Sequence, residues 1–222
     1  MPFQESELGF RYEDSTVGVF FGKALATRSL IENEFPDIQF MKVQQTHSDV
    51  IVHANTNLQT ADAHWTQEKK TALLISTADC MPILIYNNAT KTVAAVHAGW
   101  KGVCNQITVK SLKALSTENS TASDFEIWIG PHIMPDSFEV KSDVLNQLLA
   151  ASYESDKTGH FTNGDSIRVD LKDIVLSQIT ASIGSGFKLF EVNLDTLTTA
   201  CLHSYRRDKE NSGRNLSFIY PK

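Results

Sequence analysis

The chain lacks long apolar runs and has no surplus of basic residues. No stretch of about 18 consecutive apolar residues occurs, and residues 1–7 have neither the basic nor the apolar region of a signal peptide. Lys and Arg number 20 against 26 Asp and Glu, a formal charge of −6, which argues against non-specific nucleic-acid binding. We therefore expect a cytoplasmic protein with no membrane partner and no nucleic-acid partner.

Cysteine and clustered histidine are also scarce. The three cysteines, Cys80, Cys104 and Cys201, cannot all pair and lie far apart, which is typical of a reduced protein with free thiols. The 7 histidines are scattered, and no His-x-His pair occurs. This number suffices for one mononuclear metal site, but it does not supply the clustered imidazoles of a centre with several copper ions.

Strand and helix patterns alternate along the chain. Apolar runs predict strands at 38–43, 71–76, 81–86, 92–96, 125–129 and 188–192. Helical spacing predicts helices at 102–115, 142–151 and 169–183. Ser142 or Asp143 is the expected cap of the second helix, while Asp170 opens the third and Gly184 closes it. The polar stretch 153–166 predicts a loop. We therefore expect a mixed α/β fold.

Three segments place typical metal ligands beside the ends of predicted strands. His47 follows the strand that ends at Val43, Cys80 follows the strand that ends at Ser76, and His97 ends the strand that begins at residue 92. Loops at strand ends often carry functional residues. Two histidines and one cysteine suit zinc, and three protein ligands leave a fourth position open for water or substrate.

The residues alone leave other roles open for these side chains. His97 is equally typical of a hydrogen-bonded core histidine, and Cys80 of a small buried side chain. Alternatively, Cys80 is a nucleophile with His97 or His47 as its base and Asp79 or Asp49 as the orienting group. A copper site is a third interpretation, because two histidines and one cysteine also bind copper.

Two further segments have residue types suited to a nucleoside or an anion. Gly99 and Gly102 flank Trp100 and Lys101, so the backbone can approach a ligand closely, Trp100 can stack on a flat base and Lys101 can meet an anion. The alternative is a strand-to-helix turn with Trp100 in the core. Three residues near the C-terminus carry guanidinium groups suited to phosphate or carboxylate: Arg206, Arg207 and Arg214. A solvated, salt-bridged turn is the alternative explanation for them.

Five motifs occur in a specific order along the chain. They are Gln45-x-His47, Thr77-Ala78-Asp79-Cys80-Met81-Pro82, Ala95-Val96-His97-Ala98-Gly99-Trp100-Lys101-Gly102, Ile129-Gly130-Pro131, and Ser204-Tyr205-Arg206-Arg207 through Gly213-Arg214. From about residue 40 to the C-terminus, this ordered set resembles the laccase-domain family, also called polyphenol oxidase-like proteins or peptidoglycan editing factor.

The resemblance implies both an architecture and an activity. It implies one domain, residues 1–222, with central β-sheets flanked by helices, and a metal ion, usually zinc, on His47, Cys80 and His97. The implied reaction is attack of phosphate on a purine nucleoside such as adenosine, inosine or methylthioadenosine, releasing the base and ribose 1-phosphate. Adenosine deamination at the same metal is an implied side activity. The implied catalytic residues are the three ligands with Asp79, and the substrate-binding residues are Trp100, Lys101, Arg206, Arg207 and Arg214.

The chain departs from the family pattern at three places. Residues 9–15 lack the usual paired glycines, with Arg11 as a substitute for the usual basic residue. Lys101 stands where arginine is common, and the Cys-Thr that usually precedes the C-terminal motif is absent. Two other functions stay open: a metal- or cysteine-dependent amidase acting on peptidoglycan precursors, and a copper-dependent polyphenol oxidase, with Cu²⁺ in place of Zn²⁺. We expect a monomer or a homodimer.

Overall fold

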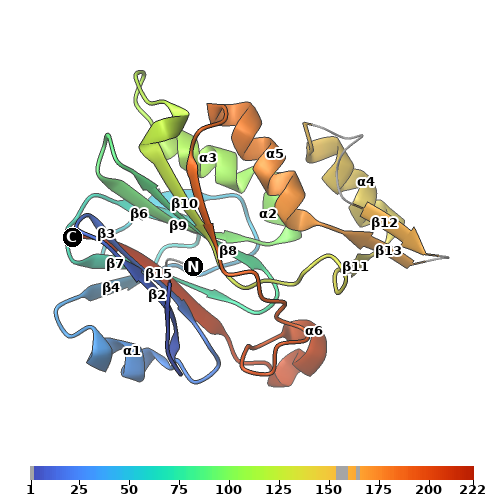
Figure 1. Ribbon diagram of the computed structural model, residues 1–222, viewed down its shortest axis with the longest axis horizontal. Helices are drawn as coiled ribbons and strands as arrows, with labels where there is room; N and C mark the ends of the chain where they lie inside the picture. Colours follow the sequence, from blue (N-terminus) through green and yellow to red (C-terminus); the bar gives the residue numbers. More distant parts are fainter. Residues whose placement is uncertain (1–2, 154–159, 164–165) are drawn as a thin grey trace.

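Two six-stranded mixed sheets form the centre of the protein (Figure 1). The computed structural model describes residues 3–153, 160–163 and 166–222. The first sheet has the order β1-β2-β3-β15-β7-β4. Its strands are β1 (Gln4–Glu5), β2 (Gly9–Glu13), β3 (Val17–Gly22), β15 (Asn215–Pro221), β7 (Thr71–Thr77) and β4 (Gln39–Lys42).

The second sheet has the order β14-β10-β8-β9-β6-β5. Its strands are β14 (Lys188–Glu191), β10 (Phe125–Ile129), β8 (Met81–Asn87), β9 (Thr92–Ala98), β6 (Ala63–Thr66) and β5 (Ile51–His53). Every residue of β8 and β9 is buried, and Pro82 pairs with His97 across these two antiparallel strands. This register brings the residue before β8, which is Cys80, to the same sheet end as His97.

The helices of the described residues are α1 (Arg28–Glu34), α2 (Trp100–Cys104), α3 (Ile107–Leu115), α4 (Ser142–Ala151), α5 (Leu171–Ile183) and α6 (Tyr205–Asp208), with short 3-10 turns at Ala122–Asp124 and Lys209–Asn211. Helix α1 packs on the first sheet, and α2, α3 and α5 pack on the second. Within the described residues, no helix combines the length and apolar composition that crossing a membrane requires.

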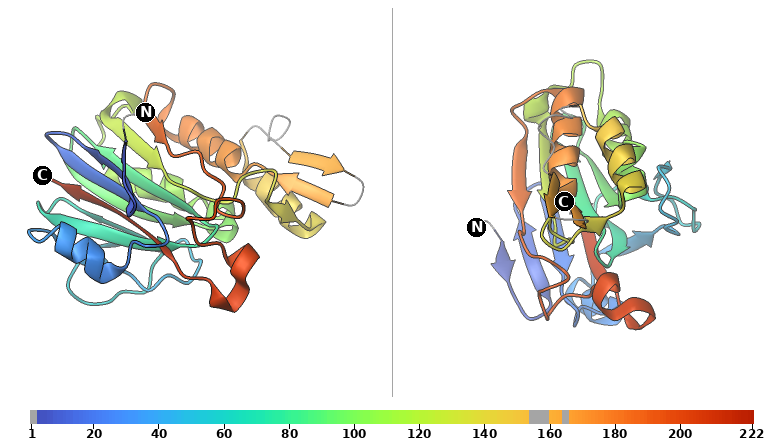
Figure 2. Two further views of the ribbon diagram at one scale, coloured as in Figure 1. Left: turned by 60° about the horizontal axis from the view of Figure 1, so that its bottom comes forward. Right: turned by 90° about the vertical axis from the view of Figure 1, so that its right-hand side faces the viewer.

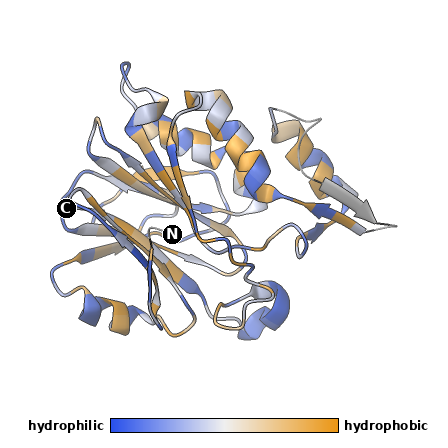
Figure 3. Cartoon of the chain, in the orientation of Figure 1, coloured by the Kyte–Doolittle hydropathy of each residue, from blue (hydrophilic) through white to orange (hydrophobic). Residues whose placement is uncertain are grey.

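Three apolar clusters lie between the layers, and the two rotated views in Figure 2 show how these layers are arranged. One lies between the two sheets and includes Leu73, Leu84 and Trp128. A second joins the second sheet to α2, α3 and α5, and a third joins the first sheet to α1. The apolar colouring of Figure 3 follows the strands, whereas α6 is hydrophilic. The expected mixed α/β class, with sheets inside and helices outside, is thus confirmed.

The predicted strands all occur, with bounds that differ by at most two residues, but three expectations about the helices and loops were partly wrong. The expected helix 102–115 is split into α2 and α3 because Gln106 takes a positive φ of 59°. The N-cap of α4 is Lys141 and not Ser142 or Asp143. The caps of α5 are as expected: the Asp170 side chain accepts from a backbone N–H, and Gly184 has a φ of 82°.

A small third sheet occupies part of the stretch expected to be a loop. It has the order β11-β13-β12, with β11 (Glu139–Val140), β12 (His160–Asn163) and β13 (Ser166–Val169). The polar composition of 153–166 concealed these strands, which are held by antiparallel pairing with each other. Residues 154–159 and 164–165 lie outside the described residues. In Figure 1 this sheet and α4 lie beside the main body.

Candidate metal centre and substrate pocket

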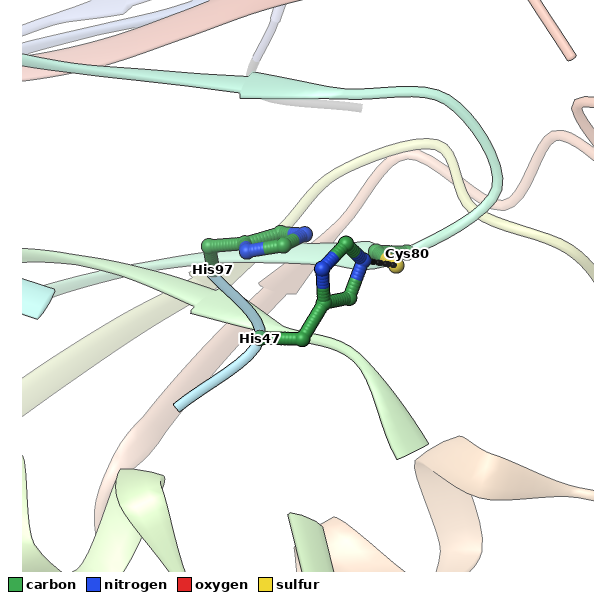
Figure 4. Close-up of side chains that lie close together, drawn as sticks. All are labelled: His47, Cys80 and His97. Atoms are coloured by element: carbon green, nitrogen blue, oxygen red, sulfur yellow. Dashed lines mark hydrogen bonds between the residues drawn. The ribbon is translucent and has the colours of Figure 1, made fainter. Parts of the chain in front are cut away.

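Three side chains from distant parts of the sequence meet at one end of the sheets (Figure 4). The candidate ligand atoms of His47, Cys80 and His97 lie within 4.8 Å of one another. The Sγ atom of Cys80 is 3.8 Å from Nε2 of His47, and the two imidazole centroids are 4.9 Å apart. Tetrahedral zinc, with ligand bonds of about 2.0–2.3 Å, needs ligand atoms roughly 3.3–3.8 Å apart. Only small side-chain movements would therefore bring the three donors to one ion.

The ring of His97 is oriented by Asp62, a residue that sequence reasoning missed. Nδ1 of His97 lies 2.7 Å from Oδ1 of Asp62, and both side chains are buried. This contact leaves Nε2 of His97 available to a metal, as in the carboxylate–histidine–zinc arrangement of many metal sites. The available signal was small: one acidic residue between Ala61 and Ala63, immediately before an apolar strand.

The loop that carries His47 is held by the same carboxylate. His47 has a positive φ of 59°, which is uncommon for a residue other than glycine. The backbone N–H groups of Thr46, His47 and Ser48 all donate to Asp62, at 3.1, 3.0 and 2.6 Å. The hydroxyl of Ser48 donates to it as well, at 2.6 Å. Asp62 therefore determines the backbone conformation from which the His47 side chain projects.

Gln45 ties the start of this loop to the first sheet. Its side-chain amide donates to the carbonyl of Ser76, and its side-chain oxygen accepts from the N–H of Ser76, both at 2.8 Å. Because Ser76 lies in β7, the loop is fastened to both sheets: to β7 through Gln45 and to the start of β6 through Asp62. The glutamine of the Gln45-x-His47 motif thus has a structural role.

Asp79 precedes the ligand Cys80 and takes a positive φ of 82°. One of its carboxylate oxygens accepts from the hydroxyl of Thr196 at 2.7 Å, and the other accepts from the backbone N–H of Arg206 at 2.6 Å. Both oxygens are thus engaged in holding the C-terminal segment against the turn that carries Cys80. These contacts give Asp79 a positioning role, and its expected catalytic role stays a prediction.

The electrostatics of the three ligands favour a thiolate. Burial would raise the pKa of the Cys80 thiol, but hydrogen bonds with His47 and His97 lower this pKa to about 7. Burial would lower the pKa of His97, but the contacts with Asp62 and Cys80 raise it to about 9. Burial also opposes ionisation of Asp62, yet bonds from His97 and Ser48 hold its pKa well below the usual range. A deprotonated cysteine is the form that binds metal.

A cavity of about 660 Å³ opens above these ligands, within the size range of small-molecule sites. Its lining residues fall into three chemical groups, which we call its floor, its apolar side and its cationic side. The floor contains the three ligands with Gln45, Ser76, Ala78 and Asp79. The apolar side contains Trp100, Ile133, Phe138 and Leu171, and the cationic side contains Tyr205, Arg206, Lys209 and Arg214.

The cationic side keeps donors available for a ligand. In the described residues, Arg206 uses Nη1 to bond the carbonyls of Ser137 and Glu139, at 3.3 and 2.9 Å. Arg214 also uses Nη1, for the adjacent carbonyls of residues 212 and 213. The remaining guanidinium donors of both arginines, together with Lys209, can therefore meet an anion in the cavity.

Two expected substrate-binding residues do not line this cavity. Lys101 is exposed, and its Nζ atom lies 5.7 Å from the centroid of the Trp100 ring. Arg207 bonds both oxygens of Asp208. Its guanidinium also donates to four backbone carbonyls, those of Thr196, Leu197, Thr199 and Leu202. Arg207 therefore fastens the C-terminal turn, and its expected contact with substrate stays a prediction.

The two glycines around Trp100 permit close packing, but only one of them borders the ligands. A Cβ atom at Gly99 would lie 3.1 Å from Sγ of Cys80 and 3.1 Å from Cδ2 of His47. A Cβ atom at Gly102 would instead approach Ile107 and the carbonyl of Ser48. The absence of a side chain at Gly99 thus leaves room for the two ligands.

The donor set describes a single-ion site. Among residues 3–153, 160–163 and 166–222, His47, Cys80 and His97 form the one group of three such ligand types whose atoms lie this close together. His64 and His132 are buried elsewhere, and His53 packs on Trp65. His47, Cys80 and His97 are therefore the candidate ligands of one ion among the described residues.

Comparisons with known proteins are consistent across sequence and fold. A family model described as multi-copper polyphenol oxidoreductase laccase matches residues 1–222. A purine nucleoside phosphorylase of Clostridium acetobutylicum is 31% identical over 189 residues, which cover 84% of this chain and 78% of that protein. The purine nucleoside phosphorylase YfiH of Escherichia coli K12 is 32% identical over 163 residues, which cover 72% of this chain and 63% of that protein.

A solved structure extends the match to the whole fold. The crystal structure of YlmD from Geobacillus stearothermophilus superposes with a TM-score of 0.88 at 22% identity, covering 100% of this chain and 99% of that chain. At this identity the likeness concerns the fold alone.

Proposed function

This chain belongs to the multi-copper polyphenol oxidoreductase laccase family, and from that premise we propose that it is a purine nucleoside phosphorylase. Relatives at about 30% identity are named for that activity. The observation that carries the proposal is the three-sided cavity. Its apolar side, with Trp100, suits a flat purine, and its cationic side suits phosphate. Both substrates of a phosphorolysis therefore have a matching surface in one cavity.

The proposed reaction is a displacement at C1′ of the nucleoside. A phosphate oxygen forms a bond to C1′ while the bond from C1′ to the purine nitrogen breaks, and the base leaves with that electron pair and takes up a proton. The products are the free base and ribose 1-phosphate. In this scheme Arg206, Lys209 and Arg214 bind and orient the phosphate, and Trp100 packs on the base. Asp79 keeps the arginine turn in place beside the floor.

His47, Cys80 and His97 are the proposed ligands of a zinc ion. Two imidazoles and a thiolate are a usual zinc set, and the contact of Asp62 with Nδ1 of His97 orients this ring so that Nε2 is left for the ion. A bound zinc ion would supply Lewis acidity at the floor of the cavity. We further propose adenosine and methylthioadenosine among the substrates and adenosine deamination as a side activity that depends on this ion. Copper on the same three ligands is the alternative.

We also propose that residues 1–222 act as one domain, because the cavity draws residues from β7, β9, α2 and the C-terminal turn. The cytoplasmic location and the monomeric or dimeric state stay predictions.

The decisive experiment compares the turnover of adenosine, inosine and methylthioadenosine with and without phosphate. Wild-type protein should release free base only when phosphate is present, and Cys80→Ala should lose this activity. Cys201→Ala is the matched control, because Cys201 is exposed and lies outside the cavity lining. Elemental analysis of the same preparations should find about one zinc per wild-type or Cys201→Ala chain and less in Cys80→Ala.

Two results would contradict the proposal. Base release at the same rate without phosphate would indicate hydrolysis. No turnover of any nucleoside by the metal-replete protein would exclude the phosphorylase and favour an amidase acting on peptidoglycan precursors. Ammonia release from adenosine, followed in the same reactions, tests the deaminase activity separately.

A further inference from the structure

We infer that Asp62 is the positioning residue of the metal centre, because one carboxylate fixes both the ring of His97 and the backbone that carries His47. The inference rests on the proposed metal site and adds a residue outside the ligand set. Asp62 is fully buried, although an unpaired buried carboxylate is strongly unfavourable. Its burial is therefore explained only by the donors that surround it.

Oδ1 of Asp62 contacts both histidines, and Oδ2 holds the residues on either side of His47. Oδ1 accepts from the backbone N–H of His47 and contacts Nδ1 of His97. Oδ2 accepts from the backbone N–H groups of Thr46 and Ser48 and from the hydroxyl of Ser48. The backbone is included too, since the carbonyl of Asp62 accepts from the N–H of His97 at 2.8 Å. No rotation of this carboxylate can serve one histidine without disturbing the other.

On the His97 side the carboxylate selects a tautomer. An ionised carboxylate only accepts hydrogen bonds, so it requires a proton on Nδ1. In the neutral ring Nε2 then carries the lone pair that a metal binds. An amide in the same place offers an NH₂ group that can donate to Nδ1, which would favour the proton on Nε2 and block the ligand atom.

On the His47 side the carboxylate stabilises an unfavourable backbone conformation. A non-glycine residue at positive φ costs roughly 1 kcal/mol or more and persists only where its surroundings hold it. Three successive N–H groups bonded to Asp62 provide that restraint. Without them the loop can relax, and Nε2 of His47 would leave its place 3.8 Å from Cys80.

The other carboxylates near the ligands have different partners. Asp49 pairs with Lys110 at the surface and lies outside the cavity lining. Asp79 holds the C-terminal segment through Thr196 and Arg206. Sequence reasoning offered these two as orienting groups, but neither contacts a histidine ligand through any described hydrogen bond, whereas Asp62 contacts both.

Zinc affinity provides a test that does not depend on enzyme activity. Metal-free protein is titrated with zinc against a chromophoric chelator, at a temperature at which far-UV circular dichroism shows each variant folded. We expect Asp62→Asn, which keeps the side-chain shape, to bind zinc about 10–100-fold more weakly than wild type. Asp49→Asn, the same substitution in the loop that carries His47, should stay within about twofold of wild type, because exposed ion pairs contribute little.

A second variant keeps the test valid if Asp62→Asn does not fold. Ser48→Ala removes only the hydroxyl bond to Asp62, and we expect zinc binding to weaken about threefold to tenfold, as for the loss of one hydrogen bond of ordinary strength. With zinc at saturation, both variants should keep the nucleoside KM of wild type and show a lower kcat. A residue that matters only for folding would instead lower the melting temperature and leave zinc affinity unchanged.

The outcomes separate the inference from the proposals on which it rests. Zinc affinities of Asp62→Asn and Ser48→Ala equal to wild type would overturn the positioning role. A wild-type protein that binds no zinc would overturn the metal site and the inference together. Wild-type zinc binding that is weakened in Asp62→Asn, in a protein that turns over no nucleoside, would support the inference while excluding the phosphorylase.

Discussion

His97 and His64 are both buried and lie on neighbouring strands of one sheet, yet their surroundings differ completely. β6 and β9 pair so that His64 lies opposite Ala95, two residues before His97. His97 contacts the Asp62 carboxylate and faces the other two ligands. Nε2 of His64 has no hydrogen-bond partner in the described structure, and burial lowers the pKa of this ring to about 4, against the contribution of the Leu74 backbone.

The contrast shows that the hydrogen-bond partners of a histidine, and not its residue type or burial, distinguish a candidate metal ligand from a core residue. A carboxylate beside an imidazole selects the tautomer that leaves one nitrogen to a metal. Without that carboxylate, a buried imidazole is kept neutral and packs as a half-apolar side chain. Arg206 and Arg207 repeat the contrast, because adjacent arginines differ in how many of their donors the protein already uses.

The largest expected effect is the difference between replacing His97 and replacing His64. In His97→Leu, zinc affinity and the rate of nucleoside phosphorolysis should each fall by more than about 100-fold. Loss of a residue that only hydrogen-bonds a metal ligand lowers metal affinity roughly 10–100-fold, and loss of the ligand itself should have a larger effect. His64→Leu should leave zinc affinity and kcat within about threefold of wild type, because it replaces a buried polar ring by an apolar side chain. Chelator competition and steady-state kinetics measure both. Equal losses in the two variants would remove the distinction between the sites.

The next effect is a pH dependence of stability specific to His64. The unfolded chain binds a proton near pH 6.5, whereas the folded protein resists protonation until about pH 4. The folded state therefore loses stability as pH falls through this window, by roughly 3 kcal/mol from this group, and the loss is constant below pH 4. Above pH 6.5 the group contributes nothing.

Urea denaturation at several pH values, for wild type and His64→Leu, isolates this contribution. The difference in unfolding free energy between the two proteins should change between pH 6.5 and 4 and stay level above pH 6.5. Parallel curves across the window would mean that His64 takes up its proton equally well in the folded protein.

Much of the fold was predictable because its strands are apolar runs with few competing interpretations. The segments 71–77, 81–87 and 125–129 are almost wholly buried, so composition alone marks them. Prediction failed where the deciding interaction is non-local or conformational. The pairing of β12 with β13 overrides a polar sequence, and the positive φ of Gln106 divides an otherwise periodic helix.

The candidate site was predictable to the extent that its residues are chemically distinctive. His47, Cys80 and His97 stand at strand ends, and the family resemblance groups them. Asp62 was missed because its role depends on the 2.7 Å contact with a strand 35 residues further along the chain. For the same reason the sequence did not reveal that Arg207 bonds backbone carbonyls, because these partners cannot be identified without the fold.

The smallest expected effect tests the arginines of the C-terminal turn. Arg214→Gln and Arg206→Gln should each raise the phosphate KM about tenfold with little change in zinc affinity, because a charged hydrogen bond to an anion contributes roughly 1.5–3 kcal/mol. Arg207→Gln should instead lower the melting temperature and shift the phosphate KM less than about threefold, because its guanidinium holds backbone carbonyls of the turn.

The matched control is Arg28→Gln, on α1 and outside the cavity lining. Its ion pair with Glu32 is exposed, so neither stability nor the phosphate KM should change measurably. A phosphate KM that rises most in Arg207→Gln, with an unchanged melting temperature, would place the anion at Arg207 and reverse the assignment of the two adjacent arginines. Because Arg207 would then have to give up its carbonyl partners to bind the anion, that result would also require the turn to rearrange on binding.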